Sequence, residues 1–152
     1  MENLDNQSHS YLFTGAIENK IDSQRRIAVP SDWREENPSG IFVIMPGCDS
    51  TLQIYPLDVY NARYANVLTP QNSVNKSIQT RQRYLFSLTL KVRCDKQGRI
   101  QLTQKLLEYA NIKDEVAFIG FGSFGQMMDA NLWHKEESKM SENGDDFLDI
   151  LG

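Results

Sequence analysis

Two stretches of this sequence predict its fold: Asp22-Ser23-Gln24-Arg25-Arg26 and Asp95-Lys96-Gln97-Gly98-Arg99, which begin 73 residues apart. Each has the form D-x-x-x-R and stands between two short segments in which apolar and polar residues alternate, as in half-buried strands. Aspartate at the first position of a turn accepts hydrogen bonds from backbone amides, and glycine adopts the positive φ of a three-residue hairpin with a bulge. The sequence therefore predicts two similar β-hairpins, with strands at residues 17–21 and 26–29 and again at 88–94 and 99–102.

The same offset continues outward from the turns and indicates an internal repeat. We interpret the chain as two copies of one unit, at residues 13–66 and 86–138. The identical pairs are Phe13 with Phe86, Asp22 with Asp95, Gln24 with Gln97, Arg26 with Arg99, Ile27 with Ile100, Glu35 with Glu108, Val43 with Val116, Gly47 with Gly120, Ser50 with Ser123, and Gln53 with Gln126.

Each copy predicts the same further elements. A short helix follows each hairpin, at residues 30–36 and 103–110, with Ser31 and Thr103 as capping residues. Two strands and a final helix complete each copy, at 41–45, 52–55 and 56–67 in the first and at 116–121, 125–128 and 129–140 in the second. A polar, basic helix at 74–84 lies between the copies. The predicted fold class is mainly β with short helices, that is, α+β.

The predicted domain organisation follows from this repeat. It comprises an N-terminal extension (1–11), a first repeat (12–67), a helical bridge (68–85), a second repeat (86–138) and an acidic tail (139–152). Both ends are polar or acidic and lack periodicity, which predicts mobile segments. The tail mixes acidic with large apolar residues, so it is either a solvated end or a docking segment for a partner or another subunit.

Net charge alone argues against a nucleic-acid ligand, because 16 basic and 20 acidic residues give a formal charge of −4 over 152 residues. Dividing the chain reverses that inference. Residues 13–138 hold 15 basic and 14 acidic side chains, whereas residues 1–12 and 139–152 carry −2 and −3. Between Lys76 and Arg99 there are seven basic residues and one acidic residue, Asp95. Such a density of positive charge suits phosphates.

The candidate site residues follow from strand alternation, which places the polar residues of each hairpin on one surface. The predicted DNA-binding residues are Lys20, Arg25, Arg26, Arg93, Lys96 and Arg99, and the predicted turn-organising residues are Asp22, Asp95 and Gly98. An arginine held by an aspartate can bind a phosphate, or the O6/N7 edge of guanine, through two parallel hydrogen bonds. Alternatively, an internal duplication could retain both turns for folding alone.

The two turns differ at their second position, Ser23 against Lys96, and at their fourth, where Arg25 replaces the glycine of the second turn. A non-glycine residue in the left-handed region costs about 1–2 kcal/mol. We expect the turn to tolerate this strain, because the flanking strands fix its register.

Other classes of protein find less support in the sequence. His9 and His134 stand apart from any Cys or Ser motif for nucleophilic catalysis, so we expect no enzyme. Cys48 and Cys94 fit no metal-ligand spacing and are expected as small, partly buried side chains without a disulfide. The glycine-rich segment 120–125 lies between two strands and predicts a tight turn rather than a phosphate-binding loop. We expect no metal, cofactor or small-molecule substrate.

The sequence also has no apolar run long enough to span a bilayer, and residues 1–10 lack the basic start and apolar stretch of a signal peptide. We therefore expect a cytoplasmic protein without a membrane partner.

These motifs resemble the MraZ family of bacterial transcriptional regulators, which have two SpoVT-AbrB (AbrB-type) units in one chain. The similarity lies in Phe13-Thr14-Gly15, in residues 21–30, in Tyr55-Pro56-Leu57-Asp58, in Asp95-Lys96-Gln97-Gly98-Arg99-Ile100 and in Leu107-Glu108-Tyr109-Ala110. It covers about residues 12–138. Two positions depart from the pattern: Arg25 replaces the usual glycine, and Thr103 stands where the first copy has Pro30.

The resemblance implies a swapped-hairpin β-barrel formed by both repeats. It further implies a homo-oligomer, commonly an octameric ring, that binds double-stranded promoter DNA at repeated short G-rich boxes. The regulated genes would be its own division and cell-wall cluster, which places the protein at the nucleoid. The alternative is a protein-interaction module, antitoxin-like or scaffolding, that uses the same barrel without DNA.

Overall fold

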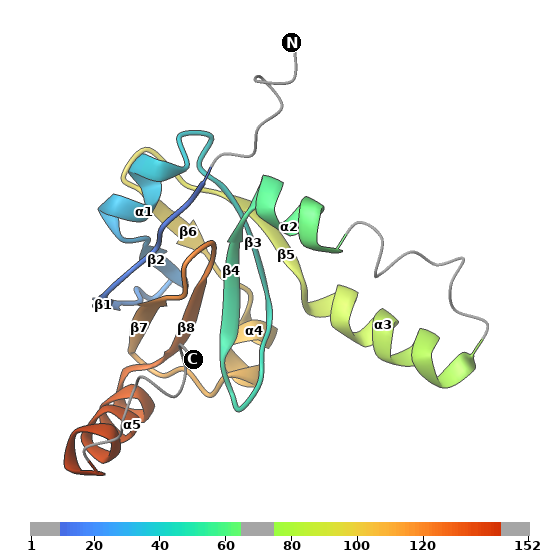
Figure 1. Cartoon of the computed structure of the whole chain (residues 1–152). Coiled ribbons are helices and arrows are strands. Elements are labelled where there is room, and N and C mark those ends of the chain that lie inside the picture. Colours follow the sequence, from blue (N-terminus) through green and yellow to red (C-terminus); the bar gives the residue numbers. More distant parts are fainter. Residues whose placement is uncertain (1–9, 65–74, 144–152) are drawn as a thin grey trace.

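The computed structural model describes residues 10–64 and 75–143 of the chain (Figure 1). The predicted N-terminal extension, the start of the bridge and the end of the acidic tail lie at least partly outside these residues. In the first repeat the elements are β1 (Ala16–Lys20), β2 (Arg26–Ala28), α1 (Ser31–Glu36), β3 (Ile41–Pro46), β4 (Leu52–Pro56) and α2 (Leu57–Tyr64). Helix α3 (Lys76–Leu88) leads into the second repeat.

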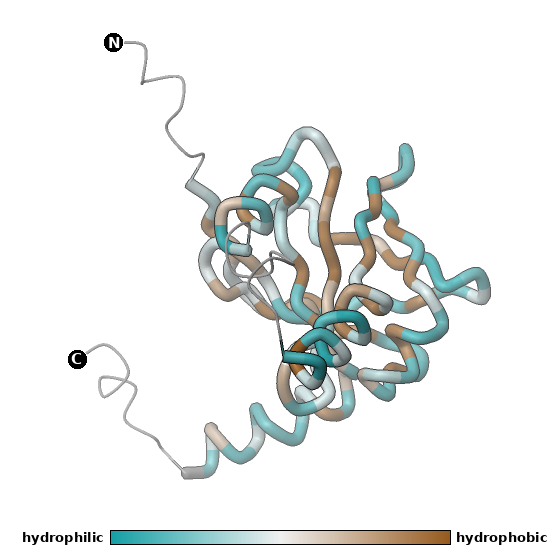
Figure 2. The backbone as a smooth tube through the Cα atoms, turned by 90° about the vertical axis from the view of Figure 1, so that its right-hand side faces the viewer, coloured by the Kyte–Doolittle hydropathy of each residue, from teal (hydrophilic) through white to brown (hydrophobic). Residues whose placement is uncertain are grey.

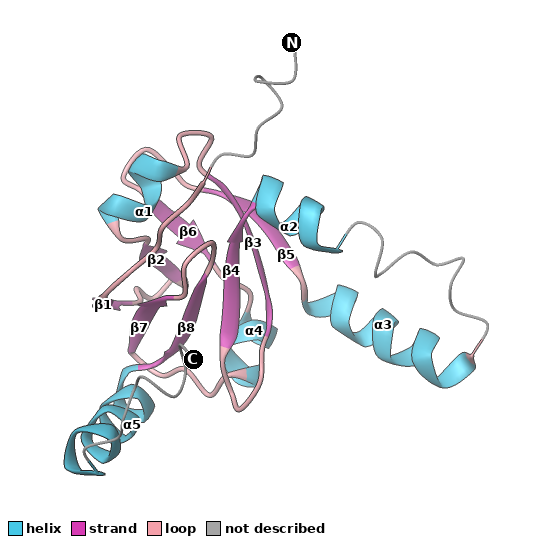
Figure 3. Cartoon of the chain, viewed as in Figure 1, coloured by secondary structure: helices cyan, strands magenta, loops and turns pink. Residues whose placement is uncertain are grey.

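The second repeat has the same elements in the same order (Figure 3). They are β5 (Leu90–Arg93), β6 (Arg99–Gln101), α4 (Gln104–Tyr109), β7 (Glu115–Gly120), β8 (Gly125–Asp129) and α5 (Ala130–Asn143). Strands β6 and β8 and helix α4 begin 73 residues after β2, β4 and α1, the offset found in the sequence. The strands and short helices thus follow one another in the predicted order, and the chain has an α+β fold.

Strand pairing exchanges elements between the repeats. The larger sheet has the order β1-β7-β8-β4-β3-β5, and β2 pairs only with β6 in a two-stranded ribbon. Strand β1 of the first repeat therefore lies against β7 of the second, while β5 of the second lies against β3 of the first. Each sheet therefore contains strands from both repeats.

This pairing corrects the prediction of two simple hairpins. Both turns are closed by backbone hydrogen bonds, Asp22 N–H to the Arg26 carbonyl at 2.9 Å and Asp95 N–H to the Arg99 carbonyl at 2.8 Å. Beyond the turn, however, β1 and β2 belong to different sheets, as do β5 and β6. The reason is that alternation identifies the buried face of a strand but not the neighbour that it pairs with.

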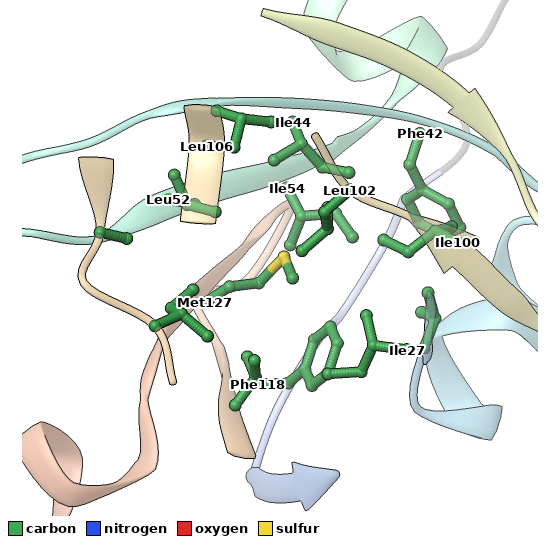
Figure 4. Packing of buried hydrophobic residues seen from close by; sticks show 14 of the residues in the cluster. Ile27, Phe42, Ile44, Leu52, Ile54, Ile100, Leu102, Leu106, Phe118 and Met127 are labelled. Carbon is green, nitrogen blue, oxygen red and sulfur yellow. The ribbon is translucent and has the colours of Figure 1, made fainter. Parts of the chain in front are cut away.

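One hydrophobic core lies between the sheet and the ribbon. Ile27 and Ile100, at the centre of the ribbon, point into it toward Phe42, Phe118 and neighbouring aliphatic side chains (Figure 4). Trp33 of α1 stacks on Phe13 with ring centroids 4.7 Å apart, so the helix is fixed to the strand edge. Hydrophobic positions are concentrated within the body of the molecule, whereas the segments that project from it are mostly hydrophilic (Figure 2).

The helix ends match the sequence in one repeat and not in the other. Thr103 caps α4 as predicted, because its hydroxyl accepts a hydrogen bond from Leu106 N–H at 3.2 Å. The prediction of Ser31 as a cap was wrong: Pro30 takes the cap position, and no side chain caps α1. Proline fixes φ for helix entry, which moves the cap one residue earlier.

Helices α3 and α5 extend away from the sheet on opposite sides (Figure 1). In α3, which begins slightly later than predicted, only Leu88 is buried. Helix α2 contains no buried residue. Elsewhere, Phe121 N–H bonds to the Phe124 carbonyl at 2.9 Å and confirms the tight turn predicted between β7 and β8. Both cysteines are free thiols, and none of the helices described is long and apolar enough to cross a membrane.

Candidate nucleic-acid interface

The β2–β6 ribbon sorts its side chains onto two faces. Ile27 is paired with Ile100, and both are 1% exposed on the core face. Arg26 faces Gln101 and Ala28 faces Arg99 in the same antiparallel register, so Arg26 and Arg99 are diagonal neighbours on the opposite, outer face. The alternation of apolar and polar residues in these two short strands thus places one arginine from each repeat on a shared surface.

A single carboxylate organises the first turn. Asp22 Oδ1 accepts hydrogen bonds from the backbone N–H groups of Gln24 and Arg26, both at 2.8 Å. Its other oxygen, Oδ2, accepts one from Arg26 Nε at 2.9 Å. The Asp22 side chain therefore fixes both the backbone of the turn and the direction of the Arg26 guanidinium.

The second turn repeats this arrangement. Asp95 Oδ1 accepts the backbone N–H groups of Gln97 and Arg99 at 2.9 Å, and Oδ2 accepts Arg99 Nε at 2.9 Å. In both turns the backbone N–H of the arginine, then its guanidinium, lowers the pKa of the aspartate below its ordinary value. Both carboxylates are therefore ionised at neutral pH, and the predicted role of Asp22 and Asp95 as turn organisers matches their contacts.

The two turns meet across the ribbon. Arg99 Nη1 lies 3.9 Å from Asp22 Oδ2, so the carboxylate of one repeat is close to the guanidinium of the other. The arginine side chains are 34% and 29% exposed. Each can still offer N–H donors to a ligand, because an arginine has five and the contact to its own aspartate uses Nε. We call this the paired-turn surface, which is formed by Asp22, Arg26, Asp95 and Arg99.

The other predicted basic residues differ in how they are held. Lys96 is exposed within the second turn. Lys20 is exposed at the end of β1, where it is paired with Glu115 of β7. Arg93 ends β5, and its Nη1 donates a hydrogen bond to the Ser39 carbonyl at 3.1 Å. Lys96 thus adjoins the paired-turn surface directly, whereas Lys20 and Arg93 stand at the strand ends that enter the turns.

Arg25 is placed differently from the other candidates. Its φ is +63°, the left-handed conformation that Gly98 adopts in the second turn with φ of +77°. Its side chain is half-buried, and Nε donates a hydrogen bond to the Leu102 carbonyl of the second repeat at 2.9 Å. The strain expected at this position is therefore present, and it is accompanied by a contact between repeats that the sequence did not predict.

Sequence reasoning missed polar residues that border the paired-turn surface. Gln24 and Gln97 are exposed at corresponding places in the two turns, and Gln101 Nε2 donates to the Gln24 carbonyl at 2.9 Å. Gln24 and Gln97 are identical residues at the 73-residue offset, and this was the sequence signal that could have identified them. Asn19 was also missed: its Nδ2 donates to the Ala28 carbonyl at 2.8 Å and ties β1 to β2.

Chemically, the paired-turn surface combines fixed guanidinium groups with amide side chains on an exposed two-stranded ribbon. Guanidinium groups bind phosphate oxygens or the acceptor edge of guanine, and glutamine amides pair with adenine. A two-stranded ribbon also fits the width of the DNA major groove. The arrangement therefore suits a polyanion with hydrogen-bond acceptors on its bases. It suits a small neutral molecule less well.

Comparisons with known proteins identify relatives over most of the chain. A family model described as "MraZ protein, putative antitoxin-like" matches residues 12–83 and again residues 85–146. The transcriptional regulator MraZ of Clostridium tetani is 32% identical over 143 residues, which cover 88% of this chain and 99% of that protein. Those of Finegoldia magna and Clostridium beijerinckii are 31% and 33% identical over 140 residues, with 92% and 91% of this chain and 96% and 94% of the relatives covered.

Proposed function

This chain belongs to the MraZ family, and from that premise we propose that it is a transcriptional regulator that binds double-stranded promoter DNA through the paired-turn surface. The observation that carries the proposal is the duplicated Asp–Arg arrangement. Asp22 holds Arg26 and Asp95 holds Arg99 at the same 2.9 Å separation on one outer face. Folding of the turns needs the aspartates and their backbone contacts, whereas two aligned, half-exposed guanidinium groups supply a surface for a ligand.

The division of labour within this surface follows from chemistry. Arg26 and Arg99 are fixed in direction by their aspartates, so they are suited to read guanine edges in short G-rich boxes. Lys20, Arg93 and Lys96 are charged side chains around them, suited to phosphates. The target in this proposal is the upstream region of the protein's own division and cell-wall gene cluster, as in the family that it resembles.

Assembly is the second part of the proposal. The exchange of β1 and β5 between the repeats supports closure of both units into a swapped-hairpin β-barrel of AbrB type. Several such chains would form a homo-oligomeric ring, as an octamer, at the nucleoid in the cytoplasm. A ring brings many paired-turn surfaces to one side, and tethered contacts can multiply avidity by about 10²- to 10⁴-fold. A solution mass near 17 kDa would contradict this oligomer.

The test measures binding of the full-length chain to duplex DNA from upstream of its own gene, with duplex of random sequence as the competitor. The variant Arg26→Ala/Arg99→Ala should lose about tenfold or more in affinity for the upstream duplex, because each guanidinium contact to a base contributes roughly 1–3 kcal/mol. Arg63→Ala is the matched control, since Arg63 is an exposed arginine of α2 that lies over the Tyr55 and Phe124 rings. Equal affinities for all three proteins would refute the proposed interface.

A further inference from the structure

The contact of Arg25 with the second repeat has a counterpart within the first repeat that is made by a different arginine. Arg34 of α1 donates a hydrogen bond from Nε to the Val29 carbonyl at 3.0 Å. Val29 corresponds to Leu102 at the 73-residue offset, and Arg25 Nε donates to the Leu102 carbonyl at 2.9 Å. The equivalent backbone carbonyl of each repeat therefore accepts a hydrogen bond from a guanidinium, at the point where the strand after the turn leads into the helix.

The two guanidinium groups come from opposite sides of the same junction. Arg34 reaches its carbonyl from the helix, and its guanidinium lies against Gly98: a Cβ at Gly98 would stand 2.4 Å from Arg34 Cζ. At the other junction, around Leu102, the helix position equivalent to Arg34 is Leu107, and the turn position equivalent to Gly98 is Arg25. Leu107 is 8% exposed, and it lines the same surface pocket as Arg25.

The backbone contacts of the two junctions are the same despite this difference. Val29 N–H donates to the Gly98 carbonyl at 3.0 Å, and Leu102 N–H donates to the Arg25 carbonyl at 2.9 Å. In each case the turn of one repeat is bonded to the strand end of the other. The two junctions thus have the same backbone bonds but different side-chain pairs, which we call their fillings. One filling is glycine in the turn with arginine in the helix, and the other is arginine in the turn with leucine in the helix.

We propose that Arg25 is a positioning residue that does the work of a helix arginine at position 107, and that the two fillings, arginine with leucine or glycine with arginine, can be exchanged at positions 25 and 107. Arg25 holds the first turn against the second repeat and so sets the place of Arg26. In this role Arg25 acts by holding the turn through its Nε contact with the Leu102 carbonyl, and the proposal assigns no DNA contact to its remaining N–H groups.

A double-mutant cycle on the full-length chain tests the exchange without any ligand. The variants are Arg25→Gly, Leu107→Arg and both together, and the measurement is the melting temperature. Leu107→Arg should lower it by about 3 °C or more in the wild-type chain, because a second guanidinium would meet Arg25 at one carbonyl. In the Arg25→Gly background it should leave the melting temperature unchanged or raise it. An equal shift in both backgrounds would overturn the exchange.

The junction around Val29, with Gly98 and Arg34, provides the reciprocal test. Gly98→Arg should lower the melting temperature because the new side chain meets the Arg34 guanidinium, and added Arg34→Leu should recover most of that loss. If Arg34→Leu adds a further loss instead, the two fillings are not interchangeable and the proposal fails.

A binding measurement separates positioning from direct contact, and this arm alone rests on the proposed function. Arg25→Gly/Leu107→Arg removes the guanidinium from the turn while the net charge is kept. Affinity for the upstream duplex should stay within about twofold of wild type, whereas a loss of about tenfold with the melting temperature restored would make Arg25 a DNA contact and overturn its positioning role. If the wild-type chain binds no DNA, the proposed function fails, and the melting-temperature cycle still decides the exchange.

Discussion

At the scale of single residues, one aspartate in each turn does two things. It accepts two backbone N–H groups, which shapes the turn, and it accepts Nε of the arginine four residues later, which directs that side chain. The same carboxylate thus couples the fold of the turn to the geometry of the paired-turn surface. Removing its charge should therefore alter both stability and DNA recognition.

The pH dependence of stability should report on these aspartates. Because the folded-state pKa of Asp22 and Asp95 is lowered, their contribution is complete above the unfolded value of about 4 and is lost as pH falls through the folded values. The melting temperature of wild type should therefore fall more steeply below about pH 4 than that of Asp22→Asn/Asp95→Asn. Parallel curves for the two proteins would show that the turns hold no such linkage.

Arginine chemistry at the same surface gives a second prediction. Arg26→Lys/Arg99→Lys keeps the charge but removes the planar group that forms two parallel hydrogen bonds. Affinity for random duplex should change by less than about threefold, because phosphate attraction remains. The preference for the upstream duplex should fall by about tenfold, as measured by competition between the two duplexes. An unchanged preference would assign sequence reading to other residues.

At the scale of elements, the exchange of strands depends on close backbone approach at one end of β7. A Cβ on Gly120 would stand 2.3 Å from backbone atoms of Phe13 and Thr14, which pass directly over it. Gly120 N–H also donates to the Gly15 carbonyl at 2.9 Å, and Phe13 N–H donates to the Gly122 carbonyl at 2.7 Å. This glycine is therefore needed for the segment before β1 to reach the second repeat.

Substitution at this contact should be costly. Gly120→Ala is expected to destabilise the chain by about 3 kcal/mol, because backbone rather than a flexible side chain must move. Gly122→Ala is the matched control: its Cβ would meet nothing within 4 Å, so only its φ of +82° opposes alanine, at about 1–2 kcal/mol. Denaturant unfolding measures both, and a smaller effect at Gly120 than at Gly122 would contradict this view of the β1–β7 contact.

Helix α5 is joined to β1 by an ion pair that titrates. His134 Nε2 lies 2.8 Å from Glu18 Oε2, and this hydrogen bond raises the pKa of His134, to which Glu137 and Glu115 also contribute by charge. The contribution is complete below the unfolded pKa of about 6.5 and is lost as pH rises through the folded value.

Amide exchange should detect this loss in α5. After correction for the intrinsic rate, its first turns should be better protected at pH 6 than at pH 8.5, and His134→Gln should remove the difference. A difference that survives in His134→Gln would mean that another group is responsible.

At the scale of the whole molecule, the two repeats share one core and one set of strands. Ile27 and Ile100 meet at its centre, β1 pairs with β7, and β5 pairs with β3. Folding should therefore be cooperative across both repeats. The surface that we propose for DNA also needs both, since each repeat supplies one of its two turns.

The sequence predicts part of this architecture. The constant offset predicts equivalent elements, and alternation correctly places Ile27 and Ile100 in the core, because both depend on local pattern. Periodicity alone could not predict the pairing of β1 with β7, since it does not identify a partner strand; only the family resemblance implied an exchange between the repeats. The Arg25 contact was likewise beyond reach, because it joins residues 77 apart in sequence.

A fragment experiment tests this interdependence. The first repeat alone, residues 1–74, lacks β7, β5 and β6, the partners of β1, β3 and β2. At dilutions where it is monomeric, it should show no cooperative thermal transition by circular dichroism, and addition of residues 75–152 should restore one. A cooperative transition in the monomeric fragment would show that one repeat folds independently.

The salt dependence of DNA affinity tests the central claim most directly. The logarithm of the binding constant falls with the logarithm of salt concentration, by about 0.9 for each phosphate neutralised. If the paired-turn surface binds DNA, Arg26→Ala/Arg99→Ala should weaken binding to the upstream duplex and reduce the magnitude of this slope, while Arg63→Ala leaves both unchanged. The same affinity and the same slope in wild type and the double variant would contradict the account.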